Sequence, residues 1–260
     1  MDPFDYTLGQ LQIYLMVVLR TAGILFVAPV FGAKRIPVQL KIWLSLLIAL
    51  AVTPTVAHNM VILPAHLLAY TVLLIEEVLW GILIGFACLL LFMGVQFSGQ
   101  IVGLQMGFGI VNVIDPQSSA QVSIIGQFQY LLAILIFLAI DGHHFLLGAL
   151  ASSFDLLPPG GLHFSGRIGE KLIRMATGIF LLAIKIGAPV MVALFLTSVA
   201  FGILARSVPQ MNVFIIGFPL KIGVGLVMLA GSIPIFFYVL EKLIRSMEGE
   251  ISQLIALFAA

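Results

Sequence analysis

The residues of this sequence that could do chemistry are the few ionisable side chains inside long apolar runs. They are Arg20, Lys41, Glu76, Glu77, Asp155, Lys185 and Lys221. An ionisable group in a membrane helix usually faces a partner charge, a water-filled cavity or an interface. For Arg20 and Lys41, snorkelling of the side chain to the end of the run is as good an explanation as a function. The sequence favours structural ion pairing, such as Lys185 or Lys221 with a glutamate, over ion transport, and leaves the partners open.

No residue pattern meets the mechanical requirements of an enzyme. A zinc protease needs two histidines four residues apart around a glutamate, and the histidines of this chain never show that spacing. The serine elbow of hydrolases and the glycine-rich loop that holds ATP phosphates are also missing from the sequence. Asp141, Gly142, His143 and His144 form a tight cluster, but adjacent histidines point to different faces of a helix, so we interpret it as a solvated helix end. We therefore expect no catalysis, no cofactor and no bound metal.

The composition places these residues in a membrane protein. Hydrophobic residues make up 62% of the chain and charged residues 9%, against about 25% charged in an ordinary soluble domain. The mean hydropathy is +1.21. Twelve basic and 11 acidic residues leave a net charge of +1, which creates no field to attract nucleic acid. We therefore expect contact with membrane lipid and no nucleic-acid partner.

Apolar runs predict six helical segments. They lie at residues 8–31, 38–56, 67–106, 122–157, 172–205 and 213–240. A bilayer core needs only about 20 helical residues, whereas residues 67–106 would extend about 60 Å as one helix. That run either breaks or lies partly inside a protein assembly. The expected fold is all-α, with about six long, partly broken membrane-type helices arranged in hairpins.

A polar stretch at residues 94–123 interrupts this apolar pattern, and Asp115 is its sole ionisable residue. Irregular backbone at membrane depth is tolerated only where protein or a water-filled cavity satisfies its polar groups. We interpret the stretch as a pore lining or plug, with a static connection between helices as the alternative. Gly99, Gly103 and Gly107 recur every four residues, which permits close packing against a neighbouring helix.

The predicted plug combines apolar bulk that excludes water with glycines that give the backbone freedom and an Asp-Pro turn. It comprises Gly107, Phe108, Gly109, Ile110, Val111, Asn112, Val113, Ile114, Asp115 and Pro116.

Four motifs resemble those of the flagellar export-gate family of FliR and its injectisome counterparts. The most specific is RSVPQMNVFIIGFPLKI at residues 206–222. The others are Val113-Ile114-Asp115-Pro116, Asp141-Gly142-His143 and Leu157-Pro158-Pro159-Gly160-Gly161. The resemblance spans nearly the whole chain in length, run order and turn positions, and it leans to the flagellar system without excluding the injectisome.

The resemblance implies one subunit of a type III protein export gate in the bacterial inner membrane, within the flagellar basal body. It implies a helical assembly with FliP and FliQ, contact with FlhB, and passage of unfolded export substrates. Residues 1–166 would be a FliP-like part and residues 167–260 a FliQ-like helical hairpin, and the family's plug loop matches the polar stretch. The residues that we expect at subunit contacts are Glu76, Glu77, Lys185, Arg206, Pro209, Gln210, Phe218, Pro219 and Lys221.

Two other function classes suit the same residues. Broken helices and midplane charges are also typical of a secondary transporter or small-molecule channel, although the sequence has no convincing pair of inverted repeats. A noncatalytic membrane scaffold would use the glycines only for packing and would leave the central loop inert.

Overall fold

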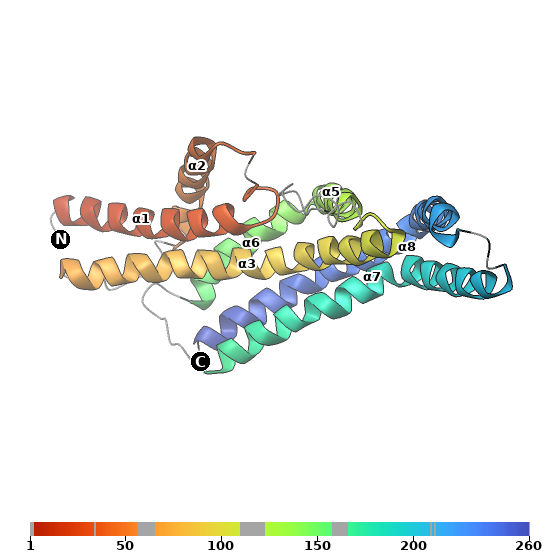
Figure 1. Cartoon of the computed structure of the whole chain (residues 1–260). Coiled ribbons are helices and arrows are strands. Elements are labelled where there is room, and N and C mark those ends of the chain that lie inside the picture. The colour runs from red at the N-terminus through yellow and green to blue at the C-terminus, as the bar shows by residue number, and fades with distance from the viewer. Residues whose placement is uncertain are drawn as a thin grey trace. The chain divides into compact units, whose positions relative to one another are not determined.

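The chain is all-α in the part that the structure describes, as the sequence predicted. The structure, a computed structural model, describes residues 3–33, 35–56, 66–109, 123–157, 166–208, 210 and 212–259. These residues form the helices α1 (Pro3–Val27), α2 (Val38–Val56), α3 (Leu67–Met106), α5 (Ile124–Ala139), α6 (Gly142–Leu156), α7 (Gly166–Ser207) and α8 (Val213–Ala259) (Figure 1). No strand occurs among them.

Among the described residues, five segments are long and apolar enough to cross a membrane. They are Gly9–Val27, Val38–Val56, Leu67–Met106, Gly169–Ser207 and Ile215–Ile251. The pair α5 and α6 makes a sixth if it is counted as one span. This pair occupies the fourth predicted run, which is not one straight helix because the chain bends by 69° between Ala139 and Gly142. Asp141 at the bend has a positive φ of 58°, a left-handed conformation that ends one helix before the next begins.

Two helices differ from the partly broken elements that the sequence suggested. Helix α3 is continuous over 40 residues, so the first part of the polar stretch, up to Met106, is helical rather than irregular. Helix α8 continues without a break through Pro219 and Pro234. It also ends at Ala259, well beyond the predicted end at residue 240. The apolar-run criterion missed this extension because charged residues that are not buried, among them Lys242, Arg245 and Glu250, interrupt the run, while Ile244, Met247 and Ile251 are buried.

The chain divides into two compact units, each with its own buried core. Unit 1 contains Met1–Leu90, Leu138–Met175 and Ile244–Ala260. Unit 2 contains Leu91–Phe137 and Ala176–Leu243. Helices α3, α7 and α8 therefore contribute residues to both units. The predicted division into residues 1–166 and 167–260 rests on likeness to two other proteins and not on contacts within this chain. It is not tested by the two units and stays a prediction.

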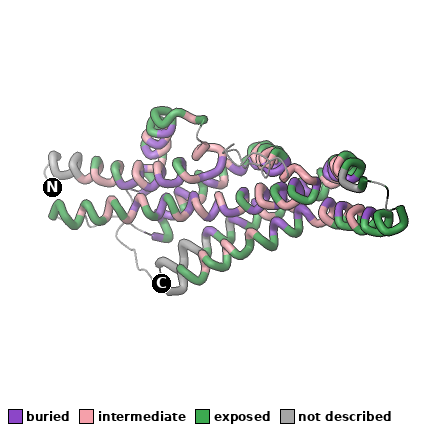
Figure 2. Tube along the Cα trace, viewed as in Figure 1, coloured by how far each residue is buried: buried purple, intermediate pink, exposed green. Residues whose placement is uncertain are grey.

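In unit 1, helix α2 has both buried and exposed positions (Figure 2). Its polar residues lie mostly at the buried positions and its large apolar residues at the exposed ones. The buried positions include Lys41, Ser45, Ala49 and Thr53. The exposed positions include Leu40, Trp43, Leu47 and Leu50, with Trp43 exposed by 65%. The inward hydroxyls are satisfied within the helix, since Ser45 donates to the Ile42 carbonyl at 2.7 Å and Thr53 to the Ala49 carbonyl at 2.7 Å. This inverted pattern is typical of a helix whose outer face meets lipid or another protein instead of water.

Glycines let the helices of each unit approach one another closely. In unit 1, a Cβ added to Gly81 of α3 would lie 2.8 Å from the Cα of Gly23 in α1. In unit 2, a Cβ added to Gly99 of α3 would lie 2.5 Å from the Cα of Gly126 in α5. Real side chains do not tolerate such distances, so glycine is required where these backbones cross.

The core of unit 2 joins α3, α5, α7 and α8. Its buried members are Val102, Met106, Ile125, Val190, Leu194 and Leu229. The Phe92 ring extends this packing with edge contacts to Tyr130 and Phe137, at centroid distances of 6.1 and 5.5 Å. The last turn of α3, which lies within the polar stretch, thus packs against three other helices.

Candidate functional site

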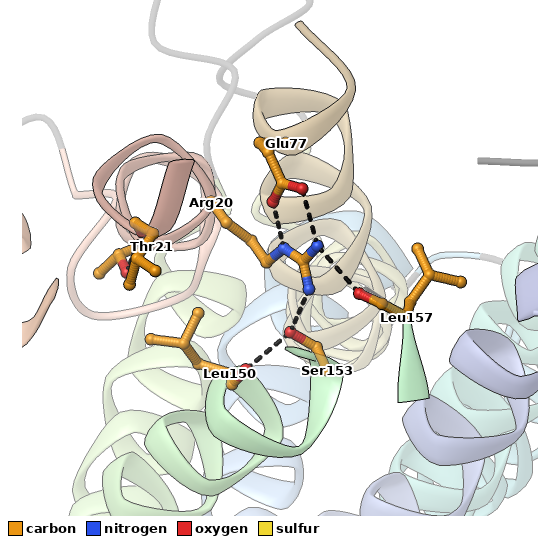
Figure 3. Close-up of polar contacts among 7 residues, drawn as sticks. Arg20, Thr21, Glu77, Leu150, Ser153 and Leu157 are labelled. Carbon is orange, nitrogen blue, oxygen red and sulfur yellow. Dashed lines mark hydrogen bonds and ion pairs between the residues drawn. The ribbon is translucent and has the colours of Figure 1, made fainter. Parts of the chain in front are cut away.

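A buried ion pair links α1 and α3 in unit 1. Arg20 and Glu77 have side chains exposed by only 0% and 1%. The Arg20 Nε donates to Glu77 Oε2 at 2.6 Å, and Nη2 donates to Oε1 at 3.0 Å (Figure 3). This two-point geometry is the strong form of an arginine–carboxylate contact. Each charge therefore stabilises the other at a position that water does not reach.

Helix α6 completes the site around the guanidinium. Arg20 Nη1 donates to Ser153 Oγ at 3.0 Å, and Nη2 also donates to the Leu157 carbonyl at 3.3 Å (Figure 3). The Arg20 Cζ lies 3.8 Å from the centroid of the Phe154 ring, a cation–π contact. One side chain thus connects α1, α3 and the end of α6, whose last carbonyls have no partner within the helix itself.

The interpretation of Arg20 as a snorkelling residue is wrong. Arg20 lies near the middle of the run at residues 8–31, so either end is about 17 Å away along the helix axis. A side chain cannot reach across that distance, and this signal was present in the sequence. Lys41 is also buried, at 7% exposure, and its Nζ lies 5.4 Å from the Phe26 ring centroid.

The two lysines proposed as ion-pair partners are not paired in this way. Glu77 is taken by Arg20, and within the described residues neither Lys185 nor Lys221 makes an ion pair. Lys185 is exposed on α7, and Lys221 is half-buried on α8. Glu76, beside Glu77, is half-buried and has contacts of its own.

The predicted plug leaves α3 through a defined helix end in unit 2. The Phe108 N–H donates to the Gly103 carbonyl and the Gly107 N–H to the Leu104 carbonyl, both at 3.1 Å. This pair of bonds with a left-handed residue is a Schellman motif, and Gly107 supplies the positive φ of 98°. A Cβ on Gly107 would also lie 2.6 Å from Phe218 Cδ1, so glycine is required there for two reasons.

Phe108 packs against the core of unit 2, which anchors the first residues of the segment. Gly109 is described as part of the same turn. The remaining plug residues lie outside the described residues: Ile110, Val111, Asn112, Val113, Ile114, Asp115 and Pro116. The plug thus stays a prediction beyond its anchored beginning.

The polar stretch also lines a groove between α3 and α7 in unit 2. The groove has a volume of about 250 Å³ and is lined by Met93, Gln96, Phe97, Gln100, Ile179 and Phe180. The Phe97 and Phe180 rings meet edge to face at 5.4 Å between centroids. Two amide side chains, one turn apart on α3, therefore border an open space in an otherwise apolar region.

The turn between α7 and α8 is exposed where it is described. Arg206 lies in the last turn of α7, and Gln210 is exposed. Pro209 lies outside the described residues. In α8, Phe218 contacts Gly107, whereas Pro219 is exposed on the helix surface.

The cluster at the bend between α5 and α6 is the arrangement closest to a metal site. Asp141, His143 and His144 each offer a ligand atom, and these atoms lie within 4.8 Å of one another. The two imidazole rings lie 4.3 Å apart, so the expectation that adjacent histidines diverge is wrong at this helix start. The side chains of Asp141 and His144 are exposed by 71% and 69%. Exposed groups of this kind commonly hold no ion, and we assign no function to them.

These features define a class: a multi-span, all-α membrane protein in which a buried ion pair joins three helices of unit 1. Within that class, the chain belongs to the bacterial export proteins, family 1, whose sequence model matches residues 11–247. The resemblance drawn from the sequence motifs is confirmed.

Curated relatives cover most of the chain. It is 34% identical over 234 residues to flagellar biosynthetic protein FliR of Bacillus subtilis (strain 168), with 88% of this chain and 89% of the relative covered. It is 29% identical over 249 residues to flagellar biosynthetic protein FliR of Escherichia coli (strain K12), with 96% and 95% covered. It is 32% identical over 216 residues to the protein of the same name from Pectobacterium carotovorum subsp. carotovorum, with 83% and 82% covered.

Proposed function

We propose that this chain is a subunit of the flagellar type III protein export gate, which forms a gated pore for unfolded export substrates with FliP and FliQ. The observation that carries the proposal is the family match over residues 11–247, together with relatives named for flagellar biosynthesis. The inner membrane within the flagellar basal body, and contact with FlhB, are parts of the same proposal. The names of the family and relatives favour an export gate over a transporter, a small-molecule channel or an inert scaffold.

Helix length supports a role as one subunit of an assembly. Helices α3, α7 and α8 contain 40, 42 and 47 residues. At about 1.5 Å per residue they extend roughly 60–70 Å, twice the ~30 Å core of a bilayer. Large apolar side chains are exposed over much of each helix, from Ile173 to Leu204 on α7 for example. One bilayer cannot cover such a length, so neighbouring subunits are needed for the remainder.

The helix end at Gly107 supports the gating part of the proposal. A plug must be held firmly at its base and be free to move beyond it. The Schellman motif and the packing of Phe108 provide a fixed base at the end of α3. The groove beside Gln96 and Gln100 supplies amide groups suited to water or to a passing polypeptide backbone.

The proposal is tested by removing the chain from its native host. Loss of the chain is expected to abolish secretion of filament protein and filament assembly, and the tagged chain is expected to copurify with FliP and FliQ. Loss of injectisome secretion with normal flagella would instead assign the chain to the injectisome. Normal export by both systems in the deleted strain would refute the proposal.

A further inference from the structure

One face of α7 in unit 2 is left without a partner in the described chain. Its members follow a seven-residue spacing typical of a helix–helix seam. They are Gly178, Leu181, Lys185, Ala188, Val192, Phe195, Val199, Gly202 and Arg206, which we call the α7 seam. All are exposed except Ala188, which is half-buried.

The fold of unit 2 uses the opposite face of α7. Val190 and Leu194 are 1% exposed and belong to the core with α3, α5 and α8. On the seam itself, a Cβ added to Gly178 or Gly202 would meet no atom within 4 Å. Small residues there leave room for another backbone to come close.

Lipid alone cannot cover this face. The exposed apolar side chains of α7 run from Ile173 to Leu204, about 47 Å along the helix axis, against ~30 Å for a bilayer core. If the bilayer covers residues 186–205, then Phe180, Leu181 and Ile184 stand outside it with 60%, 57% and 55% of their surface exposed. If the bilayer reaches past these three, Lys185 lies within it. The first placement leaves apolar side chains in water and the second places a charge in the bilayer, and a protein partner at the level of Lys185 relieves either cost.

The charges of the α7 seam indicate which charge the docked helix must carry. Lys185 and Arg206 are its ionisable members, both basic, and among the described residues Lys185 makes no ion pair. A lysine in an apolar interface needs a carboxylate beside it, because burying the charge alone is costly. We propose that the α7 seam docks an apolar transmembrane helix of another export-gate subunit, which places an Asp or Glu side chain against Lys185. This inference rests on the proposed function.

Charge reversal at Lys185 is the first test. The full tagged chain is coexpressed with FliP and FliQ, and the amount of each subunit recovered per chain is measured. We expect Lys185→Glu to lower recovery of the docked subunit at least tenfold, and Lys185→Arg to keep it within twofold. Lys242→Glu is the matched control, because Lys242 is also an exposed lysine but belongs to α8 and not to the α7 seam, and it is expected to stay within twofold. Recovery of Lys185→Glu complexes at the wild-type level overturns the inference.

If the Lys185→Glu chain does not accumulate in cells, crosslinking tests whether the α7 seam contacts another subunit. A photoreactive amino acid is placed at Leu181 or at Val192 in the otherwise unchanged chain, with position 43 on α2 as the control. Both seam positions are expected to crosslink to one helix of one other subunit, and changing an acidic residue of that helix to Lys should rescue Lys185→Glu. Adducts with lipid alone, adducts with a second copy of this chain, or a docked helix without a carboxylate would each overturn the inference.

The two proposals fail in different ways. If the wild-type chain neither copurifies with FliP and FliQ nor supports export, the proposed function is wrong. If the wild-type chain does both and the seam variants behave as it does, only the seam pairing is wrong.

Discussion

Removing one charge of the buried Arg20–Glu77 pair should destabilise the protein far more than removing both. Arg20→Met takes away the guanidinium and leaves the Glu77 carboxylate buried, with its side chain 1% exposed and no counter-charge. Breaking a buried pair in this way costs about 3–5 kcal/mol. The Leu157 carbonyl and Ser153 hydroxyl also lose their donor, which adds to the loss in the same direction.

The double variant Arg20→Met/Glu77→Met separates the charge from the packing. With both ionic groups replaced by apolar side chains, no charge is left buried, and such replacements are often neutral or stabilising. We expect the double variant to recover most of the loss. The pair of Lys171 and Glu250 is the control, because its side chains are 12% and 48% exposed, so water reaches the pair, and such surface pairs contribute only about 0–1 kcal/mol.

Thermal melting of the full chain, extracted with its native partners in mild detergent, measures these effects. At about 2–4 °C per kcal/mol for a chain of this size, Arg20→Met should lower the midpoint by roughly 6–20 °C. Lys171→Met should lower it by at most about 4 °C. Two results would refute the reasoning: the same melting midpoint for Arg20→Met and Lys171→Met, or a midpoint for the double variant that is as low as that of Arg20→Met.

Three further predictions concern the plug and the assembly. Gly107→Ala should lower the free energy of unfolding by about 1–3 kcal/mol, because Gly107 has a positive φ, and it should reduce export. The control Gly148→Ala should be neutral or stabilising, because a Cβ there meets no atom within 4 Å. Equal melting points and export rates for the two variants would contradict this prediction. Deleting residues 110–114 in an assembled complex should let ions or small solutes leak across the membrane, which is measured by release of a small dye from vesicles. A membrane that stays tight would contradict the plug hypothesis. The chain purified alone should aggregate in size-exclusion chromatography, because its exposed apolar helices lack partners, and a stable, transport-competent monomer would disprove that expectation.

Local features of the sequence determined the class, most helix positions and the family of this protein. The predicted bounds of α2 and α3, residues 38–56 and 67–106, agree with the structure. Length and apolarity of a run are properties of consecutive residues, so they can be read without knowing what the helix contacts. The hairpin motif at residues 206–222 is equally local, and it led to the family that the comparison confirmed.

Tertiary structure alone decided which charges meet. Arg20 and Glu77 are 57 residues apart in the chain, and they come together beside the close approach of Gly23 and Gly81. The continuity of α3 and the 69° bend at α5 and α6 also depend on what surrounds each segment. A polar or glycine-rich stretch can stay helical or form a turn. The outcome depends on which neighbours hydrogen-bond to its backbone and which side chains pack against its glycines. Such neighbours come from distant parts of the chain, so a charge in an apolar run indicates that a partner exists, while only the packed helices determine its identity.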